Sequence, residues 1–264
     1  MLIAQISDMH IKPPGELLYG RIDTAGFLER AVAHVNALDP RPDIVLATGD
    51  LVEGGKVEEY VQLRRLLAPL GMPVYLIPGN HDARDPLRQV FADHAYLPPS
   101  GFLQYTVEGW PVRLVALDTL APGKTQGELC ATRLDWLAAR LAESDSPTIL
   151  FLHHPPFDCG ITAFDGHRLR EGDLRLADLV RRHGHVERAL CGHVHRPIQA
   201  LWAGTMASVA PSTAHQATLD LRDQAPLSMM LEPPGVALHL WRPGSGLVTH
   251  MSYIGNYERP RPFR

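Results

Sequence analysis

The chain has 264 residues, which favours one large α/β or β-sandwich domain over two domains. Hydrophobic residues make up 45% of it and charged residues 20%, so it can bury a core and is not a disordered chain. The net charge of −4 argues against a nucleic-acid-binding face, and no apolar run approaches the about 20 residues of a membrane span.

We expect neither a targeting segment nor a cysteine framework in this chain. Asp8 interrupts the first apolar stretch, so we expect no signal peptide. Cys130, Cys159 and Cys191 are odd in number and lack Cys-x-x-Cys spacing, which predicts neither disulfides nor a thiolate zinc site. A reducing, cytoplasmic setting is therefore expected. Histidine is frequent, with 14 residues, and the positions of these histidines become the main question.

Short apolar runs ending in polar residues predict buried strands in the first two thirds of the chain. These runs span residues 2–7, 43–48, 73–77, 112–117, 147–152 and 186–191. Helical spacing of apolar residues predicts helices at 24–38, 57–70, 132–141 and 172–182. The β-α-β-α-β order at the start favours a largely parallel sheet covered by helices.

The last third has a different pattern, with short apolar runs joined by turn signals. The runs at 198–203, 206–210, 236–241 and 247–253 predict antiparallel hairpins. Residues 157–170 are long, mixed and irregular, which indicates a loop over a site. We find no repeat and no linker, and we expect one domain over 1–264 with a cap within about 157–235.

Five polar motifs stand where the predicted strands end, and strand ends are the usual site position in α/β sheets. They are Asp8-Met9-His10, Gly49-Asp50, Gly79-Asn80-His81-Asp82, His153-His154 and Gly192-His193-Val194-His195. Side chains at i and i+2 of an extended segment point the same way, so Asp8 and His10 are expected to meet at one point. The same is expected of His193 and His195. One such histidine or Gly-Asp pair is usually structural, but five in order favour a metal site.

The order of these motifs resembles the calcineurin-like metallophosphoesterase superfamily, between Asp8 and His195. Residues 19–24, 153–157 and 210–216 and the aromatic, proline-rich C-terminal end resemble its class III branch of cyclic-nucleotide and glycerophosphodiester phosphodiesterases. The resemblance implies an α/β fold of four layers, an αββα sandwich of two mixed β-sheets flanked by helices. It also implies a two-metal site at the edge of the sheets.

The resemblance also implies the metal ligands. They would be Asp8, His10, Asp50 and His195 for one ion, and Asp50, Asn80, His153 and His193 for the other, with Asp50 bridging. Nitrogen and oxygen donors suit Fe, Mn, Zn or Co better than Ca or Cu(I). Two divalent ions, two carboxylates and a bridging hydroxide leave a net charge of about +1, which matches a phosphodiester monoanion.

By the same resemblance, the protein is a phosphodiesterase that attacks small diesters with a metal-bound hydroxide. The substrates would be cyclic nucleotides such as 3′,5′-cyclic AMP, or glycerophosphodiesters. His81, beside the ligand Asn80, is expected to protonate the leaving oxygen, or else only to orient Asn80. His154 is expected to support the ligands or line the substrate site, and His215 to line that site.

Alternative functions remain open on the sequence alone. A phosphomonoesterase is one, but the segment 49–55 lacks the arginine of protein phosphatases, and Glu53 stands where purple acid phosphatases carry a ligand tyrosine. A catalytically silent binding module is another, although such modules typically lose ligands that are present here. Metal content together with hydrolysis of bis(p-nitrophenyl) phosphate would separate these functions.

The expected partners are a small phosphodiester and further copies of the chain, with no nucleic acid and no membrane. The resemblance implies a homodimer or a trimer of dimers. The run Leu227-Ser228-Met229-Met230-Leu231 is apolar, methionine-rich and flanked by prolines, which suits an adaptable interface. A buried hairpin strand is the alternative interpretation of this run.

Overall fold

The computed structural model describes residues 1–258 and 261–263, which form two mixed β-sheets. The first sheet has the order β15-β14-β1-β2-β3, and the second the order β10-β11-β9-β7-β5-β4. The strands of the first are β1 (Leu2–Ile6), β2 (Ile44–Thr48), β3 (Val74–Ile77), β14 (Gly235–Arg242) and β15 (Gly246–Tyr253). Those of the second are β4 (Tyr105–Val107), β5 (Arg113–Ala116), β7 (Thr148–Phe151), β9 (Val186–Cys191), β10 (Ile198–Trp202) and β11 (Thr205–Val209).

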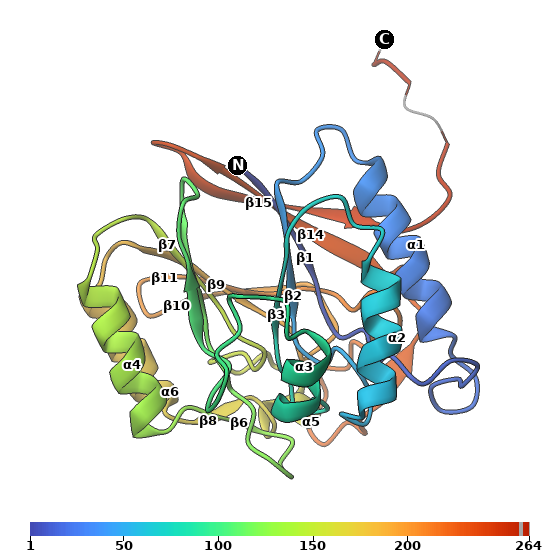
Figure 1. Ribbon diagram of the computed structural model, residues 1–264, viewed down its shortest axis with the longest axis horizontal. Coiled ribbons are helices and arrows are strands. Elements are labelled where there is room, and N and C mark those ends of the chain that lie inside the picture. The colour runs from blue at the N-terminus through green and yellow to red at the C-terminus, as the bar shows by residue number, and fades with distance from the viewer. Residues whose placement is uncertain (259–260, 264) are drawn as a thin grey trace.

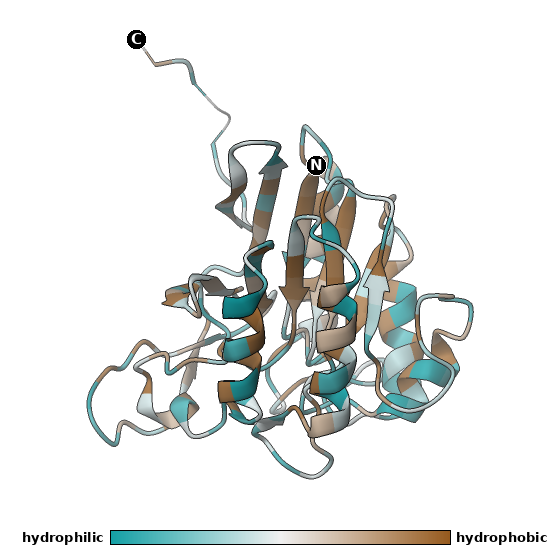
Figure 2. Ribbon diagram, turned by 90° about the vertical axis from the view of Figure 1, so that its left-hand side faces the viewer, coloured by the Kyte–Doolittle hydropathy of each residue, from teal (hydrophilic) through white to brown (hydrophobic). Residues whose placement is uncertain are grey.

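Helices cover the outer face of each sheet and complete the four expected layers (Figure 1). On the side of the first sheet lie α1 (Thr24–Ala37), α2 (Val57–Leu67) and α3 (Arg84–Val90). On the side of the second lie α4 (Ala131–Ala142) and α6 (Asp173–Arg182). Figure 2 shows the strands as the most hydrophobic part of the molecule, as expected for strands covered on both faces.

Strand β7 shows how alternate side chains join the layers. Ile149 and Phe151 belong to the core shared with the first sheet, whereas Leu150 and Leu152 pack with residues of α4 and α6. Successive side chains of a strand point to opposite faces, so one short apolar run contributes to two cores.

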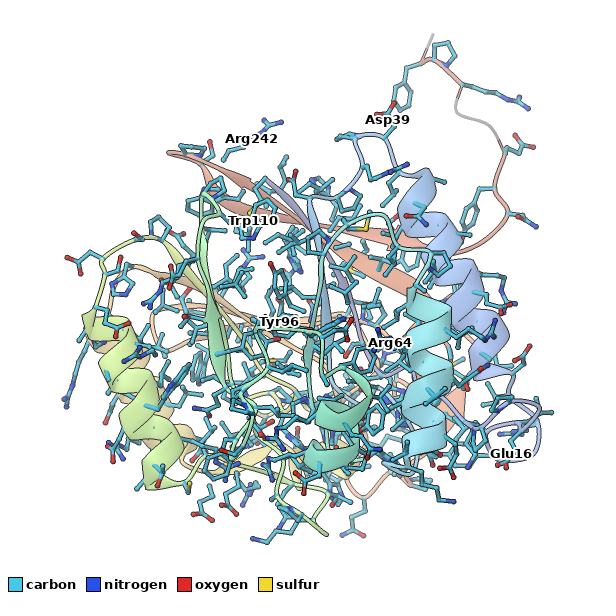
Figure 3. The ribbon with its side chains drawn as sticks, viewed as in Figure 1. Glu16, Asp39, Arg64, Tyr96, Trp110 and Arg242 are labelled. Atoms are coloured by element: carbon cyan, nitrogen blue, oxygen red, sulfur yellow. The ribbon has the colours of Figure 1, made fainter. Side chains whose placement is uncertain are left out.

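The parallel strands bring their carboxyl ends to one edge of the sandwich. Strands β1, β2 and β3 run parallel in the first sheet, and β5, β7, β9 and β11 in the second. In Figure 3, Glu16 in the loop after β1 lies at this end of the molecule, and Asp39 and Arg242 lie at the other. Polar residues that follow these strands therefore meet in space.

The predicted strands and the four predicted helices are confirmed, with ends shifted by at most three residues. Shorter elements were not predicted: α3, β4, α5 (Thr162–Asp165), β6 (Gly127–Glu128), β8 (Leu169–Glu171) and β12 (Gln216–Ala217). The run 227–231 contains the short strand β13 (Met229–Met230), which pairs with β12 but is not fully buried. Segments this short carry no measurable periodicity. Residues 157–170, expected to be an irregular loop, contain α5 and the start of β8. None of the described helices is long and apolar enough to cross a membrane.

Candidate metal centre

The five motifs meet at the edge of the sandwich on a strained backbone. Asp8, His10, Asp50, His193 and His195 have positive φ angles of 54°, 46°, 45°, 74° and 54°. Residues with side chains rarely adopt this conformation, and strain of this kind gathers at functional sites. The extended geometry that we expected for the His-x-His and Asp-x-His segments is therefore wrong, because each strand has already ended at this point.

Glycines beside the motifs make room for the donor side chains. A Cβ atom at Gly79 would lie 2.3 Å from Oδ1 of Asp50, and one at Gly49 would lie 2.4 Å from Nδ1 of His153. Both distances are far shorter than van der Waals contact. These two glycines thus permit the close approach of neighbouring segments at the site.

One group of four donors contains Asp8, His10, Asp50 and His195, whose candidate ligand atoms lie within 4.8 Å of one another. Nε2 of His10 is 3.1 Å from Nε2 of His195 and 3.7 Å from Oδ2 of Asp50. Nε2 of His195 is 3.5 Å from Oδ1 of Asp8. These are the four residues expected to hold one ion.

Hydrogen bonds orient the two histidines of this group. Nδ1 of His10 lies 2.7 Å from the carboxylate of Glu53, and Nδ1 of His195 lies 3.0 Å from the carbonyl oxygen of His215. Both oxygens can only accept, so each Nδ1 carries a proton and the two Nε2 atoms face each other. Two lone pairs at this distance repel, so either a proton or a metal ion must lie between them. The donor set therefore fits a metal ion.

The second group lies around His153, next to Asp50. Nε2 of His153 is 3.3 Å from Oδ2 of Asp50, and its Nδ1 donates to the carbonyl oxygen of Thr48 at 2.8 Å. Among the described residues, Nε2 of His153, Oδ1 of Asn80 and both ring nitrogens of His193 are buried without a hydrogen-bond partner. Unpartnered buried polar atoms are costly, and a bound cation would satisfy them.

The structure corrects one expectation about His193 and His195. They do not present ligand atoms to one point: His195 groups with Asp8, His10 and Asp50, whereas His193 groups with His153 and His154. The two side chains lie on different sides of the site because the backbone at His193 and His195 has positive φ angles. Asp50 lies between the groups, as its contacts with His10 and His153 show.

Burial and neighbouring charges shift the pKa values of these donors in both directions. Burial opposes charge on Asp50, but His153 and the other histidines hold the pKa of this carboxyl well below its usual range. Burial also disfavours charge on His153, but Asp50 raises the pKa of this imidazole to about 9. Burial lowers the pKa of His195 to about 3, and that of His193 also falls well below its usual value. Neutral imidazole and ionised carboxylate are the forms that bind metals, so Asp50, His193 and His195 are ready to bind, whereas His153 must lose a proton when an ion binds.

His81 lies beside the donors and faces the cavity above them. Its backbone N–H donates to Oδ1 of Asp50 at 2.9 Å, and its Nδ1 lies 3.0 Å from the carbonyl oxygen of Glu53 and 3.3 Å from the Glu53 carboxylate. Glu53 therefore contacts both His81 and His10. Our sequence reasoning noted this glutamate only as the residue in place of a ligand tyrosine.

The two other histidines predicted near the site differ in position. His215 lines the cavity, with its ring 4.6 Å from that of His195. His154 is fully buried behind His153 and His193 and is not among the described residues that line the cavity. Its Nδ1 pairs with Thr119 Oγ1 at 2.8 Å and its Nε2 with the Thr125 carbonyl at 3.2 Å. This geometry suits a supporting role better than contact with substrate.

The cavity above the donors has a volume of about 380 Å³ and includes residues that sequence reasoning missed. These are Tyr19, Thr125, Phe164, His167, Ala217, Leu227, Ser228 and Met229. They come from loops and from the short elements α5, β12 and β13. The resemblance of residues 19–24, the irregularity of residues 157–170 and the methionine-rich run pointed toward some of them.

Comparison with known proteins identifies the family. The model of the calcineurin-like phosphoesterases matches residues 1–197, and a probable glycerophosphodiester phosphodiesterase of Arcobacter nitrofigilis is 40% identical over the whole chain and 97% of its own length. The chain belongs to the calcineurin-like phosphoesterase family. A 3′,5′-cyclic adenosine monophosphate phosphodiesterase of Pseudomonas aeruginosa is 33% identical over 82% of this chain and 77% of its own.

A solved structure shares the phosphoesterase fold. A dimetal phosphatase from Danio rerio superposes with a TM-score of 0.64 at 15% identity, covering 97% of this chain and 99% of that protein. The expected fold and superfamily are thereby confirmed. The family and the two donor groups, with Asp50 in contact with both, together indicate a dimetal centre.

Proposed function

We propose that this phosphoesterase hydrolyses small phosphodiesters, either cyclic nucleotides or glycerophosphodiesters, at a dimetal centre held by the seven predicted ligands. The observation that carries the proposal is the position of Asp50, which contacts a donor of each group at the floor of the cavity. The names of the relatives support a diester substrate.

In the proposed mechanism, Asp8, His10 and His195 would hold one ion, and Asn80, His153 and His193 the other, with Asp50 shared. The bound ions would supply positive charge to the phosphate and lower the pKa of a bound water. Two metals of this kind suit in-line displacement at phosphorus.

His81 is placed to protonate the leaving group. Nδ1 of His81 lies against the carbonyl oxygen of Glu53, which directs Nε2 away from that backbone and toward the cavity. From there Nε2 can give a proton to the departing alkoxide. The Glu53 carboxylate, 3.3 Å from Nδ1, offers negative charge to the ring when both nitrogens carry protons.

A substrate panel tests this function. Cyclic AMP, 2′,3′-cyclic AMP, glycerophosphoethanolamine and p-nitrophenyl phosphate are compared on the metal-loaded protein, with Asp50→Asn as the inactive control. At least one diester should be turned over faster than the monoester. Faster turnover of the monoester favours the phosphomonoesterase alternative, and no turnover with two metals bound favours the silent binding module.

We propose Fe, Mn, Zn or Co as the metals, because the donors are imidazole, carboxylate and amide groups without a thiolate. Metal analysis of protein purified without added metal would identify the pair. A cytoplasmic setting is proposed on the three cysteines, which are free thiols in the described structure.

We further propose a single domain that assembles as a homodimer or a trimer of dimers through the cap. In β13, Met229 lines the cavity, whereas Met230 is 40% exposed next to Leu231, which is 65% exposed. Exposed apolar side chains of this size suit an interface. Met230→Asp should lower the mass measured by light scattering, and a monomeric wild type would contradict the proposal.

A further inference from the structure

The outer wall of the cavity is apolar and aromatic. It is formed by Tyr19, Phe164, Ala217, Leu227 and Met229, and the polar residues Thr125, His167 and Ser228 complete the lining beside the metal donors. Among the described residues that line the cavity, the one carboxylate is Asp50, and there is no lysine or arginine. The wall therefore offers contact area and no counter-charge.

Two aromatic rings flank opposite ends of the donor cluster. Phe164 packs edge-to-face against His193, with ring centroids 5.9 Å apart and planes at 88°. Tyr19 stands at 79° to His215, with centroids 6.1 Å apart. His193 belongs to one donor group and His215 adjoins the other. A diester lying across the cluster would extend its two substituents toward these rings.

The wall is also more exposed than apolar side chains usually are. Tyr19 is 61% exposed and Leu227 64% exposed, although both face the cavity. Contiguous exposed apolar surface beside polar groups marks a ligand site. Two ion pairs of the cap, Arg222 with Asp220 and Arg196 with Glu232, lie outside the cavity lining.

We propose that this wall, Tyr19, Phe164, Leu227 and Met229, is a binding subsite for an uncharged planar or apolar substituent of the diester, such as a nucleoside or an aryl group. A substituent with an ammonium or carboxylate group gains no counter-ion there and loses hydration, so it binds less well. The inference rests on the proposed phosphodiesterase function and selects a substrate class within it.

Three diesters with the same leaving group isolate the effect of the second substituent. They are the p-nitrophenyl phosphate esters of thymidine (at its 5′ oxygen), of methanol and of choline. Because p-nitrophenolate leaves in each case, differences in kcat/KM report the retained group. The thymidine ester should exceed the methyl ester by about tenfold, the size of a good apolar contact, and the choline ester should not exceed it.

Matched variants locate the subsite. Phe164→Ala and Leu227→Ala should each lower kcat/KM for the thymidine ester about five- to tenfold, mainly through KM, and change the methyl ester less than about twofold. Leu219→Ala, in the same cap, exposed by 58% and outside the cavity lining, is the control. Activity on the methyl ester also reports whether a variant is folded.

The outcomes separate this inference from the function on which it rests. If the wild type hydrolyses none of the esters, the proposed function fails. If it hydrolyses all three alike, or prefers the choline ester by contact of its cation with the aromatic faces, the function stands and the subsite proposal is overturned. Equal losses on the thymidine and methyl esters in both variants would likewise overturn it.

Discussion

The imidazoles of His10 and His195 face each other through Nε2 atoms only 3.1 Å apart, while each Nδ1 is held by an oxygen that can only accept a proton. Two lone pairs at this distance repel unless a proton or a metal ion lies between them. These donors come together only in the folded chain, so metal binding is coupled to folding. Part of the stability of the protein should depend on the ions.

Removal of metal should therefore lower the thermal stability of the protein. A ligand that binds only the folded state, at 100 times its Kd, contributes about 2.7 kcal/mol. We expect chelation to lower Tm by several degrees and added Mn²⁺ or Zn²⁺ to restore it, as measured by scanning calorimetry. Asp50→Asn should show a much smaller response to metal, and an equal response would argue against binding at this cluster.

The shared position of Asp50 predicts an asymmetry among ligand substitutions. Asp50→Asn removes a donor from both groups, whereas His193→Ala removes a donor from one. Elemental analysis should find about two metals in the wild type, fewer than one in Asp50→Asn, and an intermediate value in His193→Ala. Two metals in Asp50→Asn would refute the bridging role.

Glu53 should affect metal affinity although it is not a predicted ligand. Its carboxylate accepts from Nδ1 of His10 at 2.7 Å, which orients the ring and raises its basicity. Loss of such a partner typically costs 10- to 100-fold in affinity. Competition with a fluorescent chelator should show the highest metal affinity for the wild type, a lower affinity for Glu53→Gln and the lowest for Glu53→Ala. Glu58→Ala, at an exposed glutamate of α2, is the control, and a loss there of the same size would indicate a general charge effect.

His81→Ala should retain both metals and lose kcat in a way that depends on the leaving group. General acid catalysis is worth about 10²- to 10⁴-fold for an alkoxide, and little for p-nitrophenolate, which leaves without a proton. The measurement is kcat for a series of diesters with leaving groups of different pKa. An equal loss across the series would show that His81 acts by position or charge alone.

The sequence predicted the strands and the long helices because each contains a periodic apolar run, as in 147–152 and 24–38. The donor residues of the site could be predicted because each follows such a run. Glu53 and Phe164 could not be placed in the same way. Their roles depend on contacts between segments far apart in sequence, such as Glu53 with His10 and Phe164 with His193, which no local pattern encodes.

His239, remote from the metal donors, is a buried neutral histidine with both ring nitrogens paired. Gln5 donates through Nε2 to Thr48 and to the carbonyl of Cys191, so its Oε1 accepts from Nε2 of His239 at 3.0 Å. Nδ1 of His239 therefore accepts from the hydroxyl of Thr249 at 2.8 Å. Burial, and then the charge of Arg188, lower the pKa of His239 to about 3.

This lowered pKa predicts a loss of stability in acid. In the unfolded chain a histidine takes up a proton as the pH falls below about 6.5, whereas folded His239 resists protonation until about pH 3. The resulting loss in the free energy of unfolding is absent above pH 6.5 and grows as the pH falls toward 3, reaching about 2 kcal/mol at pH 5. Urea unfolding at pH 7.5 and pH 5 gives the free energy of unfolding at each pH. Its decrease between the two pH values should be smaller by about this amount in His239→Gln than in the wild type. His250→Gln, at an exposed position of the neighbouring strand β15, should behave as the wild type. Metal release contributes equally to all three proteins, so an unchanged fall in His239→Gln would show that this histidine is already protonated in the folded state.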